Sequence, residues 1–163
     1  MQAALLPERG VVKVVGDNVR QFLNGLVTGS MVKVAPGRPC SGVSACWDGP
    51  PAREYGLSYP DPRLPALGSR IWLLPHLAPA AAADIGAKFT GPDDYEIHRI
   101  AHGVPRGGLD FVYGDTFPHE ADMDQLNGVD FDKGCYVGQE VVSRVEHRAS
   151  ARSRVVPISY EEF

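Results

Sequence analysis

The sequence has little of several features that would assign it at once to a class of protein. Its longest apolar run lies near Leu77–Ala83, well short of the roughly 20 residues that a bilayer-crossing helix needs. The first residues, MQAALLPERGVV, predict neither a secretory signal peptide nor an Arg- and Ser-rich transit peptide. Sixteen basic and twenty acidic residues give a net charge of −4. That balance argues against a protein that binds nucleic acid through clustered positive charge.

Cysteine is also scarce, with Cys40, Cys46 and Cys135 as the three in the chain and no CxxC pair among them. An odd number without paired spacing predicts neither a disulfide framework nor a zinc site made of cysteines alone. Free thiols favour a reducing compartment, so we expect a cytoplasmic protein. The histidines do not predict a metal site either, because no further ligand stands at matching spacing from His98 and His102.

The composition is that of an ordinary globular protein. The 163 residues are 44% hydrophobic and 22% charged, enough for one domain with its own core. Hydrophobic spacing and turn residues predict strands over 11–16, 71–74 and 154–160, and helices over 17–29, 75–89, 90–105 and 138–150, with a short helix and turn within 117–134. Asp17 is the expected N-cap of the first helix. Strands and helices mix without a βαβ rhythm, which favours an α+β fold.

Residues 35–65 differ in character from the rest of the chain. The stretch APGRPCSGVSACWDGPPAREYGLSYPDPRLP is dense in Pro and Gly and has only short apolar pieces. A loop of this length is uncommon inside a compact domain. The stretch is therefore a linker, a functional loop or a junction.

The segment DKGCYVGQEVVSR, residues 132–144, carries the main candidate for chemistry, the thiol of Cys135. A thiol becomes reactive when its thiolate is stabilised. A helix that starts near Gly138 would supply free N–H groups, and Lys133 would add a positive charge. Gly134 and Gly138 would let a ligand approach the backbone closely. The structural alternative is a cysteine buried as a small apolar side chain, which is common for free cysteines.

Three arginines in the following helix share one face if that helix persists: Arg144, Arg148 and Arg152 stand four residues apart. Such a row would suit an anionic ligand, such as a carboxylate-rich cofactor or an RNA phosphate. The alternative for each arginine is a solvated helix face.

A family resemblance rests on these same residues. The segment FDKGCYVGQEVVSRVEHR closely resembles the motif of the YgfZ-type folate-binding proteins, relatives of the aminomethyltransferase (T-protein) of the glycine cleavage system. The preceding EIHRIAHGVPRGGLDFVYGDTFPHEADMDQLNGVDF and DPRLPALGSR continue the resemblance, and VVKVVGDNVRQFLNGLVTGSMVKVAPGR is similar to the family's opening. The resemblance covers about residues 8–38 and 44–158.

The resemblance implies an α+β fold of the T-protein and YgfZ type that binds tetrahydrofolate or a derivative in a central opening. It implies an accessory factor in iron–sulfur cluster assembly or maintenance, whose partners are iron–sulfur proteins or their assembly machinery and which indirectly supports tRNA modification. Cys135 would be the functional thiol. The residues expected to contact the folate are Lys133, Gly134, Tyr136, Gly138, Gln139, Glu140, Arg144 and Arg148. No metal ligand, direct nucleic-acid contact or membrane contact is expected.

The sequence also departs from the family pattern. After APGRP the chain continues through CSGVSACWDGPP directly to a later family segment, and it ends where the family's C-terminal β-barrel domain should begin. We therefore expect a fold that is internally shortened and C-terminally truncated. The expected parts are 1–39, the opening of the folate-binding domain; 40–65, the junction; and 66–163, the remainder with the KGCYVGQE motif.

Three functions stay open from the sequence. The first is the iron–sulfur accessory factor, and the second is a folate-dependent transferase that moves an aminomethyl group. The second would carry an acidic residue after Arg99-Ile100, suited to the pterin, where this chain has Ala101. The third is a folded remnant without a ligand. Whether the chain is an enzyme is thus left open, with a non-catalytic accessory role favoured.

Overall fold

The computed structural model describes residues 1–9, 14–35, 55–148 and 151–161. Its strands form two separate two-stranded sheets: β1 (Gln2–Ala4) pairs in parallel with β4 (Lys88–Thr90), and β2 (Gly56–Pro60) pairs antiparallel with β3 (Ser69–Leu73). The α-helices are α1 (Val19–Asn24), α2 (Ala78–Asp84), α3 (Pro92–Ala101) and α4 (Gln139–Arg148), and two 3₁₀ turns are η1 (Pro65–Leu67) and η2 (Pro75–Leu77). This mixture confirms the α+β class. None of the helices in these ranges is long and apolar enough to cross a membrane.

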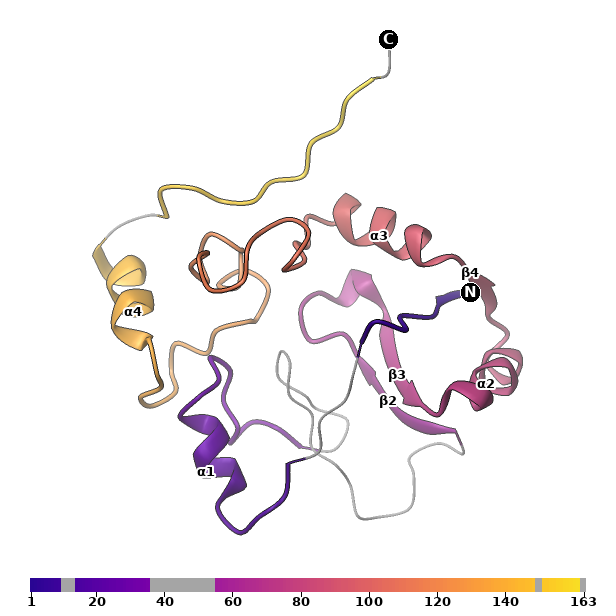
Figure 1. The fold of residues 1–163 in the computed structure, drawn as a ribbon, viewed down its shortest axis with the longest axis horizontal. Helices are drawn as coiled ribbons and strands as arrows, with labels where there is room; N and C mark the ends of the chain where they lie inside the picture. Colours follow the sequence, from indigo (N-terminus) through magenta and orange to yellow (C-terminus); the bar gives the residue numbers. More distant parts are fainter. Residues whose placement is uncertain (10–13, 36–54, 149–150, 162–163) are drawn as a thin grey trace.

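The elements lie around the molecule in an open arrangement rather than in stacked layers (Figure 1). The β2–β3 hairpin and α2 lie on one side, and α1 and α4 lie on the other. Helix α3 and the long turn-rich segment that follows it connect the two sides. Residues 151–161 have no regular secondary structure and lead towards the C-terminus, and Arg154 contacts Asp122 and Asp124 in the turn-rich segment.

The β2–β3 hairpin is the most regular part of the fold. Five residue pairs align between the strands, from Gly56 opposite Leu73 to Pro60 opposite Ser69. The ring of Tyr59 meets the ring of Trp72 edge to face, with centroids 5.5 Å apart, a favourable aromatic geometry. The strand predicted over 71–74 is thus confirmed. β2 lies within 40–65, the range expected to be a junction.

Helix α3 forms for the reasons that its sequence indicates. Pro92 occupies the first turn, where its missing N–H is no loss. Asp93 and Asp94 follow at the positive end of the helix, and the N–H of Gly91 donates to Asp94 Oδ2 at 3.1 Å. The helix stops before Gly103, whose φ of 66° is in the left-handed region. The predicted start and stop are both confirmed.

Several predicted elements differ from those in the structure. The first helix starts at Val19 and not after Asp17, and its N-cap position is Asn18. Of the strand predicted over 11–16, residues 11–13 lie outside the described residues, and 14–16 are not in a strand. The range 75–89 is helical only to Asp84, because the chain then turns at Gly86, with φ of 64°, into β4.

The predicted C-terminal elements also need correction. Residues 117–134 form successive turns and no helix. The strand predicted over 154–160 is wrong, because a β-branched run forms a strand only where a neighbouring strand supplies partners. Among the described residues this segment makes one backbone hydrogen bond, from the N–H of Val155 to the carbonyl of Glu120 at 2.9 Å. The helix predicted over 138–150 is confirmed as α4.

The described part of the chain has a modest apolar core. Its members are Met31, Val34, Tyr59, Leu67, Ala78, Ala81, Ala82, Val104, Ala121, Val129 and Val142. Most are small, and Val104 is the one large side chain below 2% exposure. Ionic contacts join separate segments as well, among them Asp61 with Arg70 and Arg154 with Asp124. The boundaries expected at 39 and 65 are not tested by this arrangement.

Candidate functional site

The residues around Cys135 form an exposed loop directly before α4. We call residues 132–138 the Cys135 loop. The side chain of Cys135 is exposed, so the alternative of a buried apolar cysteine is wrong. Cys40 and Cys46 lie outside the described residues.

Gln139, the first residue of α4, stabilises the Cys135 loop through hydrogen bonds made by both the nitrogen and the oxygen of its side-chain amide. Its Nε2 donates to Cys135 Sγ at 3.6 Å, and its Oε1 accepts from the N–H of Tyr136 at 2.9 Å. Gly138 takes φ of 87°, a left-handed conformation that side chains disfavour. This geometry places an accessible thiol beside an amide donor and just before a helix start, as the sequence indicates.

Lys133 has a different role from the one predicted. Its Nζ donates to the carbonyl oxygens of Asn24 at 2.7 Å, Val27 at 2.5 Å and Gly29 at 2.9 Å. These carbonyls belong to the last residue of α1 and to the loop that follows it, where helical carbonyls lack partners and the dipole is negative. The ammonium also lies 4.9 Å from the centroid of the Tyr136 ring. Lys133 therefore fastens the Cys135 loop to α1, and its effect on the thiol stays a prediction.

Further contacts join the same two segments, which lie about a hundred residues apart in the sequence. The N–H of Val137 donates to the carbonyl of Gly25 at 2.9 Å, and the N–H of Asp130 donates to the carbonyl of Thr28 at 2.9 Å. Lys33 Nζ lies 2.6 Å from Asp130 Oδ2, and this hydrogen bond raises the pKa of Lys33. The segment after α1 is thus the platform on which the Cys135 loop rests.

The predicted folate-contacting residues do not all come together. Lys133 and Tyr136 are in contact, as are Tyr136 and Gln139. A Cβ added at Gly134 or Gly138 would meet nothing within 4 Å, so neither glycine lies against another part of the chain. The side chain of Glu140 is exposed, whereas Tyr136 is half-buried and burial raises its pKa.

The remaining two residues of that prediction lie further along α4. Arg144 lines a cavity on α4 that is separate from the Cys135 loop. Arg148 ends α4, and its side chain lies outside the described part of the chain. The expected row of three arginines on one helix face is incomplete, because α4 ends before Arg152.

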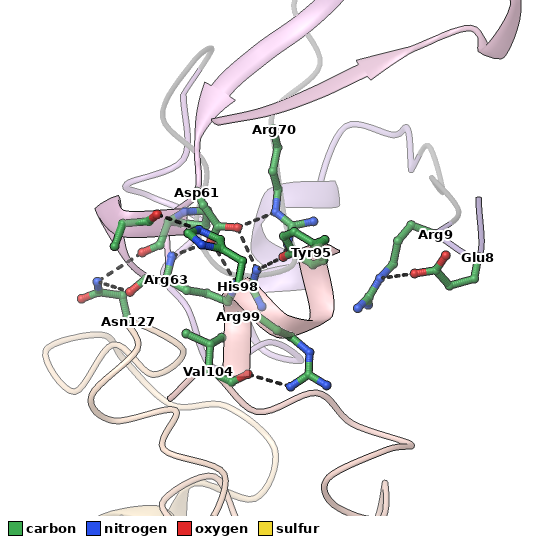
Figure 2. Close-up of polar contacts among 12 residues, drawn as sticks. Glu8, Arg9, Asp61, Arg63, Arg70, Tyr95, His98, Arg99, Val104 and Asn127 are labelled. Carbon is green, nitrogen blue, oxygen red and sulfur yellow. Dashed lines mark hydrogen bonds and ion pairs between the residues drawn. The ribbon is translucent and has the colours of Figure 1, made fainter. Parts of the chain in front are cut away.

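A polar cluster that the sequence reasoning missed lies between the β2–β3 hairpin and α3 (Figure 2). Asp61 is buried and accepts hydrogen bonds from Arg63 Nε at 3.0 Å and from Arg70 Nε at 2.7 Å. Both arginines also donate to the hydroxyl of Tyr95, at 2.9 and 3.1 Å. Burial alone would raise the pKa of Asp61, but the hydrogen bonds from Arg63 and Arg70 outweigh it and lower the pKa to about 2. The cluster therefore stays charged and links the hairpin to α3.

A second ionic group centres on Arg99, whose side chain is 3% exposed. It donates to Glu96 and Asp110 and to the carbonyl of Val104 at 3.0 Å. Arg106 completes the group by donating to Glu96 Oε1 at 2.6 Å. These contacts fix the turn after α3, and among the described residues the Arg99 nitrogens already donate to carboxylate and carbonyl oxygens, so we assign this group to structure.

The histidines do not form a metal site within the described residues. The rings of His98 and His102 are in contact on α3, with centroids 4.7 Å apart, as their four-residue spacing indicates. His98 Nε2 is 3.0 Å from the carbonyl oxygen of Ala66. No group of three or more metal-ligating side chains occurs in the ranges that the structure covers.

Comparison with known proteins connects the chain to iron–sulfur cluster assembly factors. No family model matches the sequence. It is similar to the "Iron-sulfur cluster assembly factor IBA57 homolog, mitochondrial" of Mycosarcoma maydis, at 40% identity over 72% of this chain and 30% of that protein. Proteins of the same name in Neurospora crassa and Dictyostelium discoideum are 40% and 36% identical, each over 60% of this chain, and over 22% and 24% of their own lengths.

These relatives correct one expectation and refine another. The prediction of a cytoplasmic protein is contradicted, because the relatives are mitochondrial by name. Cysteine usage misled it, because a few free thiols distinguish reducing from oxidising surroundings and do not tell one reducing compartment from another.

The resemblance to YgfZ-type proteins is confirmed at the level of the superfamily. The chain spans about 30% or less of the length of the relatives described here. Over the residues that align, its homologues are the mitochondrial iron–sulfur cluster assembly factors named IBA57.

Proposed function

We propose that this chain acts as an accessory factor in iron–sulfur cluster assembly or maintenance, with Cys135 as its functional thiol. Homologues that carry this role in their names, at 33–40% identity, support the proposal. The single structural observation that carries it is the exposed Cys135 side chain on a loop fastened to α1. The partners would be iron–sulfur proteins or their assembly machinery, and any effect on tRNA modification would pass through an iron–sulfur enzyme.

The chemistry that Cys135 offers is that of an accessible thiol. Its thiolate can ligate a metal centre or take part in thiol exchange. The Gln139 amide at 3.6 Å is a donor that can orient the sulfur. The fastening of the Cys135 loop through Lys133 and Val137 keeps the thiol at a defined place on the surface, where a partner protein can reach it.

Tetrahydrofolate is the ligand that the family resemblance implies, and its fit to the predicted residues is incomplete. The Lys133 ammonium donates to backbone carbonyls, whereas a Cβ added at Gly134 or Gly138 would meet nothing within 4 Å, which leaves room for a ligand to approach the backbone there. Of the predicted set, Arg144 lines a cavity. Tetrahydrofolate stays a proposed ligand, and the role proposed for Cys135 does not require it.

The test of the thiol is the substitution Cys135→Ala. In cells that depend on this protein for a cluster-dependent enzyme, we expect the variant to abolish support of that enzyme while its thermal unfolding stays close to wild type. The fold should persist because the Cys135 side chain is exposed. The matched control is Asp132→Ala, an exposed side chain in the same loop. Equal enzyme activity with Cys135→Ala and wild type would refute the thiol role.

A further inference from the structure

A cavity of about 310 Å³ lies on α4, where three segments of the chain meet. Helix α4 supplies one wall, the segment 117–120 supplies another, and residues 151–152 close the third side. Its lining residues are Phe117, His119, Glu120, Arg144, Val145, Ala151 and Arg152. The residues of the Cys135 loop do not line it.

The charged residues of the cavity leave an excess of positive charge. Arg144 and Arg152 both line it, and neither takes part in an ion pair among the described residues. The carboxylate of Glu120 is already occupied, because it accepts from the N–H of Phe117 at 2.9 Å and from Ser153 Oγ at 2.8 Å. Two arginines therefore face a single, hydrogen-bonded carboxylate, an arrangement that favours an anion.

His119 provides a second and independent indication of a ligand. Its side chain is 3% exposed, and its Nε2 lies 3.2 Å from Glu146 Oε2 on α4. Its Nδ1 is buried and has no hydrogen-bond partner in the described part of the chain. Buried polar atoms without a partner are rare in folded proteins. With Nε2–H donating to the carboxylate, Nδ1 is left as an acceptor, or as a donor once the ring is protonated.

The rest of the lining is apolar, contributed by Phe117, Val145 and Ala151. We propose that this cavity binds a small anion in which a phosphate or carboxylate group is attached to an apolar body. The oxyanion accepts hydrogen bonds from Arg144 and Arg152 and, with the His119 ring in its protonated form, from His119 Nδ1–H. The apolar body packs against Phe117 and Val145. This site is distinct from the Cys135 loop and does not depend on the function proposed for it.

Phenyl phosphate is the probe that tests this assignment, in titrations of the purified full chain by calorimetry. We expect saturable binding, with no binding of phenol. Each of Arg144→Ala and Arg152→Ala should weaken binding about tenfold, because each removes a charge-assisted hydrogen bond. Arg9→Ala is the matched control, since it removes the same charge from an exposed arginine outside the cavity. Benzoate in place of phenyl phosphate distinguishes a carboxylate ligand from a phosphate.

A spectroscopic signal keeps the test independent of how well the variants fold. The ¹⁵N resonance of His119 Nδ1 should shift on addition of the bound probe, while those of the exposed His76 and His102 stay in place. Absence of saturable binding of both probes would overturn the proposal. Arginine variants that bind as tightly as wild type, or an unmoved Nδ1 resonance in the complex, would also overturn it.

Discussion

At the scale of single residues, Asp61 is the carboxylate on which two arginines converge. Its side chain is 2% exposed, whereas those of Arg63 and Arg70 are 19% and 25% exposed. One negative charge thus compensates two positive charges in a largely desolvated place. Removing one partner of such a group leaves the others uncompensated, which costs more than the pair itself contributes.

The substitution Asp61→Asn should therefore destabilise the fold. We expect a loss of about 2 to 3 kcal/mol in the free energy of unfolding at neutral pH, measured by urea denaturation. Asp93→Asn is the control, because Asp93 is an exposed aspartate in the first turn of α3. If both variants unfold at the same urea concentration as wild type, the Asp61 cluster does not hold the hairpin to α3.

The lowered pKa of Asp61 also predicts an acid-sensitive contribution to stability. The pKa falls from 3.8 to about 2 in the folded chain, so folding favours the charged form. This contribution, about 2 kcal/mol, is present in full above pH 4 and is lost as the pH falls towards 2. Urea denaturation at pH 6 and pH 2.5 checks it, and Asp61→Asn should show a flatter dependence over this window.

At the scale of elements, the contact between α1 and the Cys135 loop organises the candidate site. Helix α1 has six residues, and isolated helices of that length are not stable in water. Its C-terminal carbonyls receive the Lys133 ammonium and the Val137 N–H. The helix and the loop thus complete each other's hydrogen bonds, and we expect each to depend on the other.

The substitution Lys133→Met tests this dependence. It removes three hydrogen bonds to carbonyls while it keeps most of the side-chain volume, so we expect a loss of about 1 to 3 kcal/mol in stability. Hydrogen exchange of the Val137 amide, which donates to Gly25, should become faster. Lys88→Met, at an exposed position on β4, is the control. Unchanged exchange at Val137 would mean that the lysine does not hold the loop.

At the scale of the whole molecule, the open arrangement of the elements explains why ligand binding needs a direct test. Large apolar side chains such as Phe22, Leu26, Val137 and Ile158 are exposed, and exposed apolar surface commonly marks contact sites. The described residues bring only part of the predicted folate set together.

Tetrahydrofolate binding is therefore a prediction for the whole chain. Calorimetry should show saturable binding, and a thermal melt should shift upwards, because a ligand that binds only the folded state stabilises it. Cooperative unfolding without binding would assign the chain to the third function considered, a fold without this ligand. Phenyl phosphate in the same melt tests the α4 cavity separately, because Arg152→Ala should weaken phenyl phosphate binding and Arg152 is not among the residues predicted to contact folate.

The sequence determined the local features of this protein, because they depend on neighbouring residues. Pro92, Asp93 and Gly103 specify where α3 starts and stops. The KGCYVGQE motif predicts a thiol directly before a helix, and it also indicates the superfamily. The strand predictions failed where a strand depends on a second strand that is distant in the sequence. Residues 154–160 have the β-branched composition of a strand but no neighbouring strand in the described residues, and β1 forms because β4 lies beside it.

Only the tertiary structure decided what the charged side chains do. Lys133 is two residues from Cys135 in the sequence, yet its ammonium serves carbonyls about a hundred residues away. Asp61 accepts a hydrogen bond from Arg70 on β3. Arg144 lines the same cavity as His119 and Arg152. Which charged side chains come close together depends on the tertiary fold, because ionic partners can be far apart in the sequence. Helix caps and turns, in contrast, depend on residues only a few positions apart. For that physical reason the start and stop of α3 could be predicted from the sequence, and the ionic contacts could not.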